Sequence, residues 1–324
     1  MQTARTIKQL ACALALGFAI GVPCRAADLT IAVSRGPVSL PIYVAEAQGY
    51  FEREGVAVRI NECASGRSCF QLLAQGQADA ATAAELLVTL DSFTGSSVAI
   101  IATLSSSARN IKLVTRGDNG IKVPQDLGGK RVGTVTGTSA EYFLDRWLVF
   151  HEMEPNQVHI IPLAPDQLVL ALQRREVDAI AIWEPIASTA LAAVAPGGIV
   201  MTSPRVYTQH FTLVASRQAI SHREADLIKL LRALARAERF IAEQPAQAKL
   251  ILKARLIRVE GLENLFEHDF HLTLEQSLIA TMDGQARWAV RQGVVRSSGP
   301  GNLLRSIEPA LLREAVPGAV SLVQ

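Results

Sequence analysis

Short apolar segments alternate with amphipathic segments along most of this chain, at spacings that predict strands and helices in turn. Residues 29–34 form an apolar run that predicts a buried strand, and a helical pattern begins at Pro41 and ends before Gly55. Further strands are expected at 56–60 and 79–82, with a helix at 70–75 between them and another that begins at Glu85. This order is typical of an α/β protein with parallel sheets covered on both faces.

The same order of elements returns about a hundred residues further along. Strands are predicted at 131–136, 157–161 and 177–182, with helices at 140–151 and 165–172 and a helix opened by residues 183–185. The helix at 140–151 places Phe143, Trp147 and Phe150 on one face. Four residues precede identical residues by 99 positions: Leu73, Asp79, Ala80 and Glu85 match Leu172, Asp178, Ala179 and Glu184. The repeat predicts two similar α/β lobes.

The segments between and after the repeats predict how the lobes are joined. Strands are expected at 98–104, 111–115 and 210–216, with crossings between lobes near Thr115 and Phe211. We therefore assign residues 27–115 and 212–324 to the first lobe and 116–211 to the second. Beyond His222 the pattern predicts helices, at 225–244, 245–254, 261–267 and 273–292. No low-complexity linker separates the lobes, which favours a hinged pair.

The first 26 residues have a different pattern, in which Arg5 and Lys8 precede an apolar run at 10–22. Small residues at Cys24 and Ala26 complete the layout of a secretory signal peptide cleaved near Ala26. The alternative is a membrane anchor, but the apolar run is shorter than the roughly 20 residues that span a bilayer. A lipoprotein site is disfavoured because the leucine expected before Cys24 is missing. We therefore expect an exported, periplasmic protein.

Composition excludes several classes of function. Hydrophobic residues make up 49% of the chain and charged residues 19%, which excludes intrinsic disorder as the main state. The 32 basic and 30 acidic residues give a net charge of +2, and loss of three basic residues with the leader leaves −1. No block of like charge occurs, so neither nucleic acid nor an anionic membrane surface is an expected partner.

Removal of the leader leaves two cysteines, Cys63 and Cys69. In an oxidising compartment they can close a small disulfide loop, which we favour over the alternative of a reduced pair. Two thiols without a nearby histidine supply at best half of a zinc site, so we expect no metal. Nothing in the sequence calls for a cofactor.

Small polar residues follow the predicted strands of both lobes, where ligands of parallel α/β sheets bind. Glycine lets a ligand approach the backbone, hydroxyls donate hydrogen bonds, and helix N-termini attract anions or carbonyl oxygens. The alternative is plain helix capping, because serine and threonine are favoured N-caps. The candidates are Ser34, Ser39, Ser65, Gly66 and Thr82 in the first lobe and Thr136, Gly137, Thr138 and Ser139 in the second.

Larger side chains at the same strand ends are further candidates. Trp183 ends an apolar strand, and it can either wall a ligand pocket, which we favour, or continue into the core. Glu85 and Glu184 stand at equivalent helix starts, where each can complement the helix dipole, bind a ligand or dock a partner. Arg35 and Arg67 lie in loops predicted to face the cleft, and they either balance an anionic ligand or remain solvated.

Four segments together resemble the sulfonate/nitrate/taurine-type periplasmic binding proteins of ABC importers, a group that includes pyrimidine (thiamine-precursor) binders. They are PIYVAEAQGYFEREGVAV, LLAQGQADAATAAE, DLGGKRVGTVTGTSAEYFL and LQRREVDAIAIWEP, within residues 29–215. The resemblance implies a two-lobed fold with hinge crossovers and a ligand held in the cleft. It places ligand contacts in the loops at 34–41, 64–66, 84–85, 137–139 and 183–185. The chain departs from the family pattern in its bracketing cysteines and in Glu184, where aspartate is frequent.

We therefore interpret the chain as a binding protein that delivers a small solute to an inner-membrane ABC permease, and we expect it to be a monomer. A periplasmic sensor subunit that signals to a membrane receptor would use the same cleft and stays open as an alternative. An enzyme on a similar scaffold is the third hypothesis. It is disfavoured because the sequence contains no GxSxG, P-loop or HExxH motif and no histidine paired with a nucleophile at a strand end.

Overall fold

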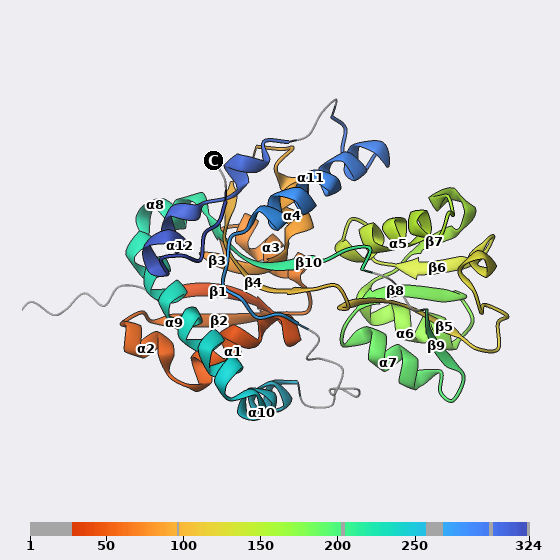
Figure 1. The fold of residues 1–324 in the computed structure, drawn as a ribbon, viewed down its shortest axis with the longest axis horizontal. Helices are drawn as coiled ribbons and strands as arrows, with labels where there is room; N and C mark the ends of the chain where they lie inside the picture. The colour runs from red at the N-terminus through yellow and green to blue at the C-terminus, as the bar shows by residue number, and fades with distance from the viewer. Residues whose placement is uncertain (1–27, 96, 202–204, 257–267, 298–300, 323–324) are drawn as a thin grey trace, which may run out of the picture.

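The computed structural model describes residues 28–95, 97–201, 205–256, 268–297 and 301–322, and it contains two mixed five-stranded sheets flanked by helices. Figure 1 shows the two sheets in separate lobes that lie side by side along the long axis of the molecule. The predicted α/β architecture with two lobes is confirmed. The expected leader and the expected helix at 261–267 lie outside the described residues.

The first sheet has the strand order β2-β1-β3-β10-β4. Strand β1 runs parallel to β2 and β3, whereas β10 runs antiparallel to both β3 and β4. Its bounds are β1 (Leu29–Ser34), β2 (Val58–Cys63), β3 (Ala80–Ala84), β4 (Val98–Ser107) and β10 (Gln209–Ser216). The sheet is therefore mixed rather than wholly parallel, because one strand enters it from the opposite direction.

The second sheet repeats this topology in the order β7-β6-β8-β5-β9. Strand β6 pairs in parallel with β7 and β8, and β5 is antiparallel to β8 and β9. Its bounds are β5 (Ile111–Arg116), β6 (Arg131–Thr134), β7 (His159–Pro162), β8 (Ala179–Trp183) and β9 (Gly198–Met201). Strands β10 and β5 thus hold equivalent places, and each arrives in its sheet from the other lobe.

The crossings between the lobes therefore lie between β4 and β5 and between β9 and β10 (Figure 1). The expected boundary after Thr115 falls inside β5, whose residues pair with β8 in the second sheet. The expected boundary at residue 211 falls inside β10, which pairs with β3 and β4 in the first sheet. The sequence pattern shows where strands lie but not which sheet an isolated strand joins, and this moves both boundaries by a few residues.

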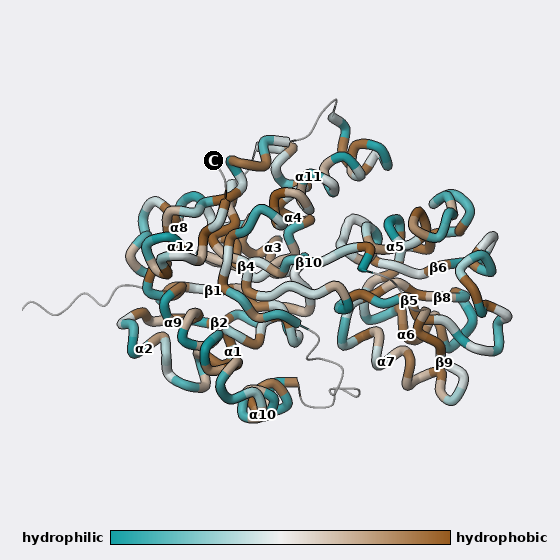
Figure 2. The backbone as a smooth tube through the Cα atoms, in the orientation of Figure 1, coloured by the Kyte–Doolittle hydropathy of each residue, from teal (hydrophilic) through white to brown (hydrophobic). Residues whose placement is uncertain are grey.

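Helices cover both faces of each sheet, and the hydropathy pattern follows this arrangement (Figure 2). Along β5, Leu113 packs with the apolar cluster that contains Trp147, while its neighbour Val114 packs with the cluster that contains Leu168 and Leu172. Successive side chains of a strand point to opposite faces, so both faces are buried. The helices of the second lobe are α5 (Ser139–Phe150), α6 (Pro165–Gln173) and α7 (Ile186–Ala193).

The first lobe carries the remaining helices, including those of the C-terminal segment. They are α1 (Leu40–Ala47), α2 (Tyr50–Glu54), α3 (Gly66–Ala74), α4 (Glu85–Asp91), α8 (Arg217–His222), α9 (Glu224–Glu243), α10 (Pro245–Arg255), α11 (Gln276–Arg291) and α12 (Pro309–Ala315). Helix α9 packs against α1, α2, α10 and α12. Within the described part of the chain, no helix is both long and apolar enough to cross a bilayer.

Two local expectations differ from the structure. The single helix predicted from Pro41 is divided into α1 and α2, because Gly49 adopts a left-handed conformation with φ of 66°. Phe150 does not share the buried face of Phe143 and Trp147 and is 57% exposed at the last residue of α5. Both differences arise at helix ends, where periodicity carries the least information.

Candidate functional site

A cavity lies between the two lobes, where strand ends and helix starts from both sheets meet. It encloses about 530 Å³ of space free of atoms, part of it open to solvent. Its walls come from the loop after β1, the starts of α3 and α5, the ends of β3 and β8, and both crossings. The lining residues are Ser34, Arg35, Gly36, Val38, Ser65, Gly66, Arg67, Ala84, Leu87, Asn110, Thr138, Ser139, Trp183, Glu184, Gln209 and Phe211.

The structure brings most of the predicted contact residues to this one cavity. Those that line it are Ser34, Ser65, Gly66, Thr138, Ser139, Trp183 and Glu184. Those outside its lining are Ser39, Thr82, Glu85, Thr136 and Gly137. Ser39 is fully buried, and its hydroxyl donates to the carbonyl oxygen of Ser34 at 2.8 Å. Ser39 therefore shapes the loop after β1 from behind.

Several hydroxyls at the cavity hold helix ends. Ser65 caps α3, where its Oγ accepts from the backbone N–H of Ser68 at 3.2 Å. Thr138 caps α5 and accepts from the N–H of Ala140 at 3.3 Å, while its own hydroxyl donates to Val135 at 2.6 Å. The capping interpretation therefore applies to both residues. It also fixes the starts of α3 and α5 at the cavity, one from each lobe, where their partial positive charges favour an anion.

Arg67, the second residue of α3, reaches across to the other lobe. Its guanidinium donates to the carbonyl oxygens of Thr136 at 3.0 Å and Gly137 at 2.6 Å. A side chain on Gly137 would place its Cβ 2.5 Å from the Arg67 Nη2, and the residue has φ of 65°. Glycine is thus favoured here by the backbone conformation, and a larger residue would also displace the Arg67 guanidinium from its present position.

Of the two arginines that line the cavity, one has a carboxylate partner in the part of the chain that the structure describes and the other does not. Arg35 forms an ion pair with Glu62 at 3.0 Å. Among the described residues, Arg67 binds backbone carbonyls and has no carboxylate within ion-pair distance. Burial raises the pKa of Glu141, which accepts from the N–H of Gly137 at 2.6 Å, and Arg67 offsets part of this rise. The cavity therefore holds a cation whose charge is not neutralised by direct contact.

Trp183 and Glu184 lie together at the end of β8. Trp183 is partly buried, lines the cavity, and packs against the apolar clusters on both faces of the second sheet. Glu184 is 4% exposed, and its carboxylate pairs with Lys112 at 2.7 Å and accepts from Ser188 N and Oγ at 3.0 and 2.9 Å. The oxygens of Glu184 are thus already engaged within the second lobe.

An apolar wall completes the cavity. Val38, Ala84 and Phe211 form a small buried cluster, and Leu87 lines the same side. A Cβ on Gly66 would meet the Phe211 ring and the backbone of Ala83 at 3.4 Å, so glycine permits the close packing of α3 here. A ligand in this cavity would meet polar groups at the helix starts and an apolar surface on the other side.

Sequence reasoning missed two amides, Asn110 and Gln209, that line the cavity from the two crossings. Asn110 precedes β5 and Gln209 begins β10. They bond to each other, since Asn110 Nδ2 donates to Gln209 Oε1 at 2.6 Å. In the sequence, each of these amides is an uncharged polar residue beside an expected crossing. They indicate a shared site only when the two crossings are known to lie side by side.

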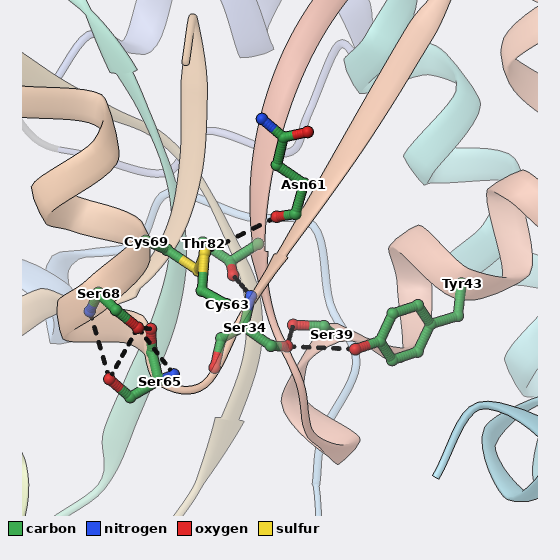
Figure 3. Close-up of a disulfide and its surroundings, with 9 residues drawn as sticks. All are labelled: Ser34, Ser39, Tyr43, Asn61, Cys63, Ser65, Ser68, Cys69 and Thr82. Atoms are coloured by element: carbon green, nitrogen blue, oxygen red, sulfur yellow. Dashed lines mark hydrogen bonds between the residues drawn. A yellow bond between two sulfur atoms is a disulfide. The ribbon is translucent and has the colours of Figure 1, made fainter. Parts of the chain in front are cut away.

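The disulfide between Cys63 and Cys69 is present, as the spacing predicted. Figure 3 shows it joining the end of β2 to α3, with the capping serines Ser65 and Ser68 beside it. The two Cα atoms are 5.5 Å apart, and Cys69 is fully buried. The bridge therefore closes the loop that carries Ser65, Gly66 and Arg67 to the cavity.

Glu85 lies apart from the cavity lining, in a buried network at the second crossing. Its carboxylate accepts from the Tyr207 hydroxyl at 2.5 Å, Gln285 Nε2 at 2.7 Å and the backbone N–H of His210 at 3.1 Å. Burial raises the pKa of Glu85 to about 7, and the bonds from Tyr207 and Gln285 offset part of the rise. Glu85 thus links α4 to the crossing and to α11.

A two-lobed α/β fold with double crossings and a cavity between the lobes defines a protein of the periplasmic-binding-protein type. The sequence matches the NMT1/THI5-like family over residues 36–248, about two thirds of the chain, and the chain therefore belongs to this family. The resemblance noted from the sequence motifs is confirmed.

Individual relatives agree with this assignment. The taurine-binding periplasmic protein of Escherichia coli is 27% identical over 58% of this chain and 56% of its own length. The alkanesulfonate-binding protein of Xanthomonas axonopodis pv. citri, solved with bound MOPS, has a TM-score of 0.74 at 16% identity and covers 88% of this chain and 99% of that chain. The periplasmic nitrate-binding protein of Synechocystis PCC 6803 has a TM-score of 0.72 at 15% identity, covering 89% and 88%.

The same fold also occurs in an enzyme. The desulfurization enzyme DSZB has a TM-score of 0.66 at 15% identity and covers 88% of this chain and 98% of that chain. Likeness of fold at this identity does not separate binding from catalysis. The choice between a binding protein and an enzyme therefore depends on the residues that line the cavity.

Proposed function

We propose that this protein is the solute-binding component of an ABC importer, which captures a small anion between its lobes and delivers it to an inner-membrane permease. The observation that carries the proposal is the convergence of two helix starts, α3 and α5, at one interlobe cavity with the guanidinium of Arg67, which contacts no carboxylate directly among the described residues. Fixed dipoles and one cation can replace the hydration shell of an anion without any chemical step.

The names of the relatives suggest the class of solute. Sulfonates, taurine and nitrate are anions or carry an anionic group, and these charges suit the helix starts. The apolar wall of Val38, Ala84 and Phe211 suits a short hydrocarbon portion better than a bare inorganic ion. We therefore place small organic sulfonates and carboxylates first among the candidate solutes, with nitrate and pyrimidines after them.

The cavity favours binding over catalysis. The two cysteines of the described residues are bonded to each other, so neither offers a thiolate nucleophile. The hydroxyls of Ser65 and Thr138 are engaged in helix caps and have no histidine among their bonding partners. A nucleophile needs a base within hydrogen-bond reach, and the polar groups of the cavity lining are not arranged in that way.

The proposal is tested with the mature protein, unfolded and refolded to remove any carried ligand. We expect at least one of propanesulfonate, taurine, nitrate or propanoate to raise the melting temperature and to bind with a stoichiometry near one by calorimetry. The recovered solute should be chemically unchanged after prolonged incubation. Turnover of a bound compound would favour an enzyme, and dependence of signalling rather than uptake on the gene would favour a sensor subunit.

Replacing Trp183 by alanine is expected to weaken binding of that solute by roughly 1 to 3 kcal/mol, because the aromatic wall at the end of β8 is lost. Calorimetric titration measures the change. Trp183→Phe is the matched control, and it should retain most of the affinity since it keeps an apolar ring at this place. Unchanged affinity in the alanine variant, with lowered thermal stability, would assign Trp183 to the core instead.

A further inference from the structure

The two crossings between the lobes are joined at the cavity by a chain of hydrogen bonds. Asn110 Nδ2 donates to Gln209 Oε1 at 2.6 Å, and Gln209 Nε2 donates to Ser139 Oγ at 2.7 Å. All three residues line the cavity, and they are 4%, 5% and 4% exposed. The chain therefore connects each crossing to the start of α5, and all three of its residues belong to the cavity wall.

One atom of this chain is left without a partner among the described residues. Asn110 Oδ1 is buried and accepts no hydrogen bond. Buried carbonyl oxygens are rarely left in this state, because they lose their bonds to water without replacement. The part of the cavity wall formed by Val38 and Phe211 is apolar and offers no donor side chain. Because Asn110 lines the cavity, we look to a bound solute for the missing donor.

The cavity thus presents two kinds of polar surface. The start of α5 with the Ser139 hydroxyl, the start of α3 and the Arg67 guanidinium supply donors and positive charge, which suit an anionic group. Asn110 Oδ1 supplies an acceptor, which suits an N–H or O–H donor. A simple alkyl anion satisfies the first surface and leaves the second unpaired.

We propose that Asn110 Oδ1 is a specificity-determining acceptor, and that the solute is a small anion with an N–H or O–H donor on its uncharged portion. This inference rests on the proposed function, since it names the chemical class of the solute captured in the same cavity. A site built to accept such a hydrogen bond rejects an isosteric alkyl analogue, because the acceptor is then buried without a partner.

The test compares pairs of anions of equal size that differ only in a donor. The pairs are isethionate with propanesulfonate and glycolate with propanoate, and nitrate is included as an anion without a donor. With the unaltered protein we expect the donor member of the pair that binds to have a dissociation constant at least about tenfold lower, by calorimetry.

Two variants identify the acceptor. Asn110→Leu removes it at similar volume, and the ratio of the two dissociation constants should fall to about one. Gln209→Met breaks the same amide–amide bond but leaves Asn110 Oδ1 in place, and the ratio should stay above about tenfold. If the leucine variant does not fold, Asn110→Ser replaces it: it withdraws the acceptor by shortening the side chain, and the ratio should again fall to about one.

Three results would overturn the inference. They are equal affinities within each pair for the unaltered protein, a donor preference that persists in Asn110→Leu, and binding of nitrate alone. In each of these the proposed function stands, because a small anion is still bound. If the folded protein binds none of the anions, the proposed function itself fails and the inference fails with it.

Discussion

Replacing Glu85 by glutamine is expected to stabilise the protein increasingly, relative to the unaltered chain, as the pH rises from about 5 to about 8. The pKa of Glu85 is raised by burial to about 7 from an ordinary value of 4.5. Between these values the folded state holds a proton that the unfolded state has lost. The free energy of unfolding of the unaltered protein therefore falls through this window, by about 3 kcal/mol in total.

Glutamine stays neutral at every pH, so the free energy of unfolding of the variant does not fall for this reason as the pH rises. The glutamine keeps an amide oxygen for the bonds from Tyr207 and Gln285, which reach the same carboxylate oxygen in the structure. Its amide nitrogen loses the bond from the His210 N–H, and this loss is the same at every pH. The histidines titrate in the opposite sense, since burial lowers the pKa values of His210 and His268 to about 4 and their contribution is lost as the pH falls. Because both proteins share these histidines, the difference between the two unfolding free energies isolates Glu85.

Urea unfolding of both proteins across this pH range measures the effect. Tyr207→Phe is the companion variant: it removes a donor that lowers the pKa of Glu85, so the loss of stability should extend to higher pH. Parallel curves for the unaltered protein and Glu85→Gln would show that the carboxylate does not titrate in this range. The network would then be a charged one at all the pH values tested.

The repeat in the sequence predicted most of the fold. Strands and helices alternate in the same order in both halves, and the structure gives both sheets the same topology. The pattern placed most of β10 in the first lobe, where it lies. It assigned β5 to the wrong lobe, because both faces of such a strand are apolar in either sheet. Sheet membership depends on packing between distant segments, which periodicity does not record.

The candidate site was predictable at its strand ends and not beyond them. Ser65, Thr138 and Trp183 lie at the cavity because ligands meet α/β sheets where strands run into helices. Asn110 and Gln209 come together only through the pairing of two crossings that are far apart in the sequence. No local pattern contains that contact.

Glu85 and Glu184 show how equivalent sequence positions acquire different roles. Glu85 follows β3 and Glu184 follows β8, which hold equivalent places in the two sheets, and both side chains are buried, at 0% and 4% exposure. Glu85 meets neutral donors from the crossing and α11, whereas Glu184 meets the ammonium group of Lys112. The elements packed on each strand end, rather than the repeat itself, decide what each carboxylate binds.

Replacing Lys112 by methionine is expected to lower the free energy of unfolding by about 3 kcal/mol, because it leaves the Glu184 carboxylate buried without its counter-charge. The two side chains are 17% and 2% exposed, so the carboxylate is the member that water cannot reach. Ser188 and the start of α7 compensate only part of the lost attraction. Glu184→Gln alone should have a smaller effect, since a lone Lys112 retains some contact with water.

The double variant Lys112→Met with Glu184→Gln separates the pair from its surroundings. A neutral amide at residue 184 can still accept from the Ser188 N–H, so the double variant should recover most of the stability that Lys112→Met alone loses. Urea unfolding of the four proteins gives the coupling between the two residues. Additive losses would mean that the ion pair contributes little, and Glu184 would then be held mainly by Ser188. Because the oxygens of Glu184 are engaged within the second lobe, we expect the double variant to bind the solute within about threefold of the unaltered affinity.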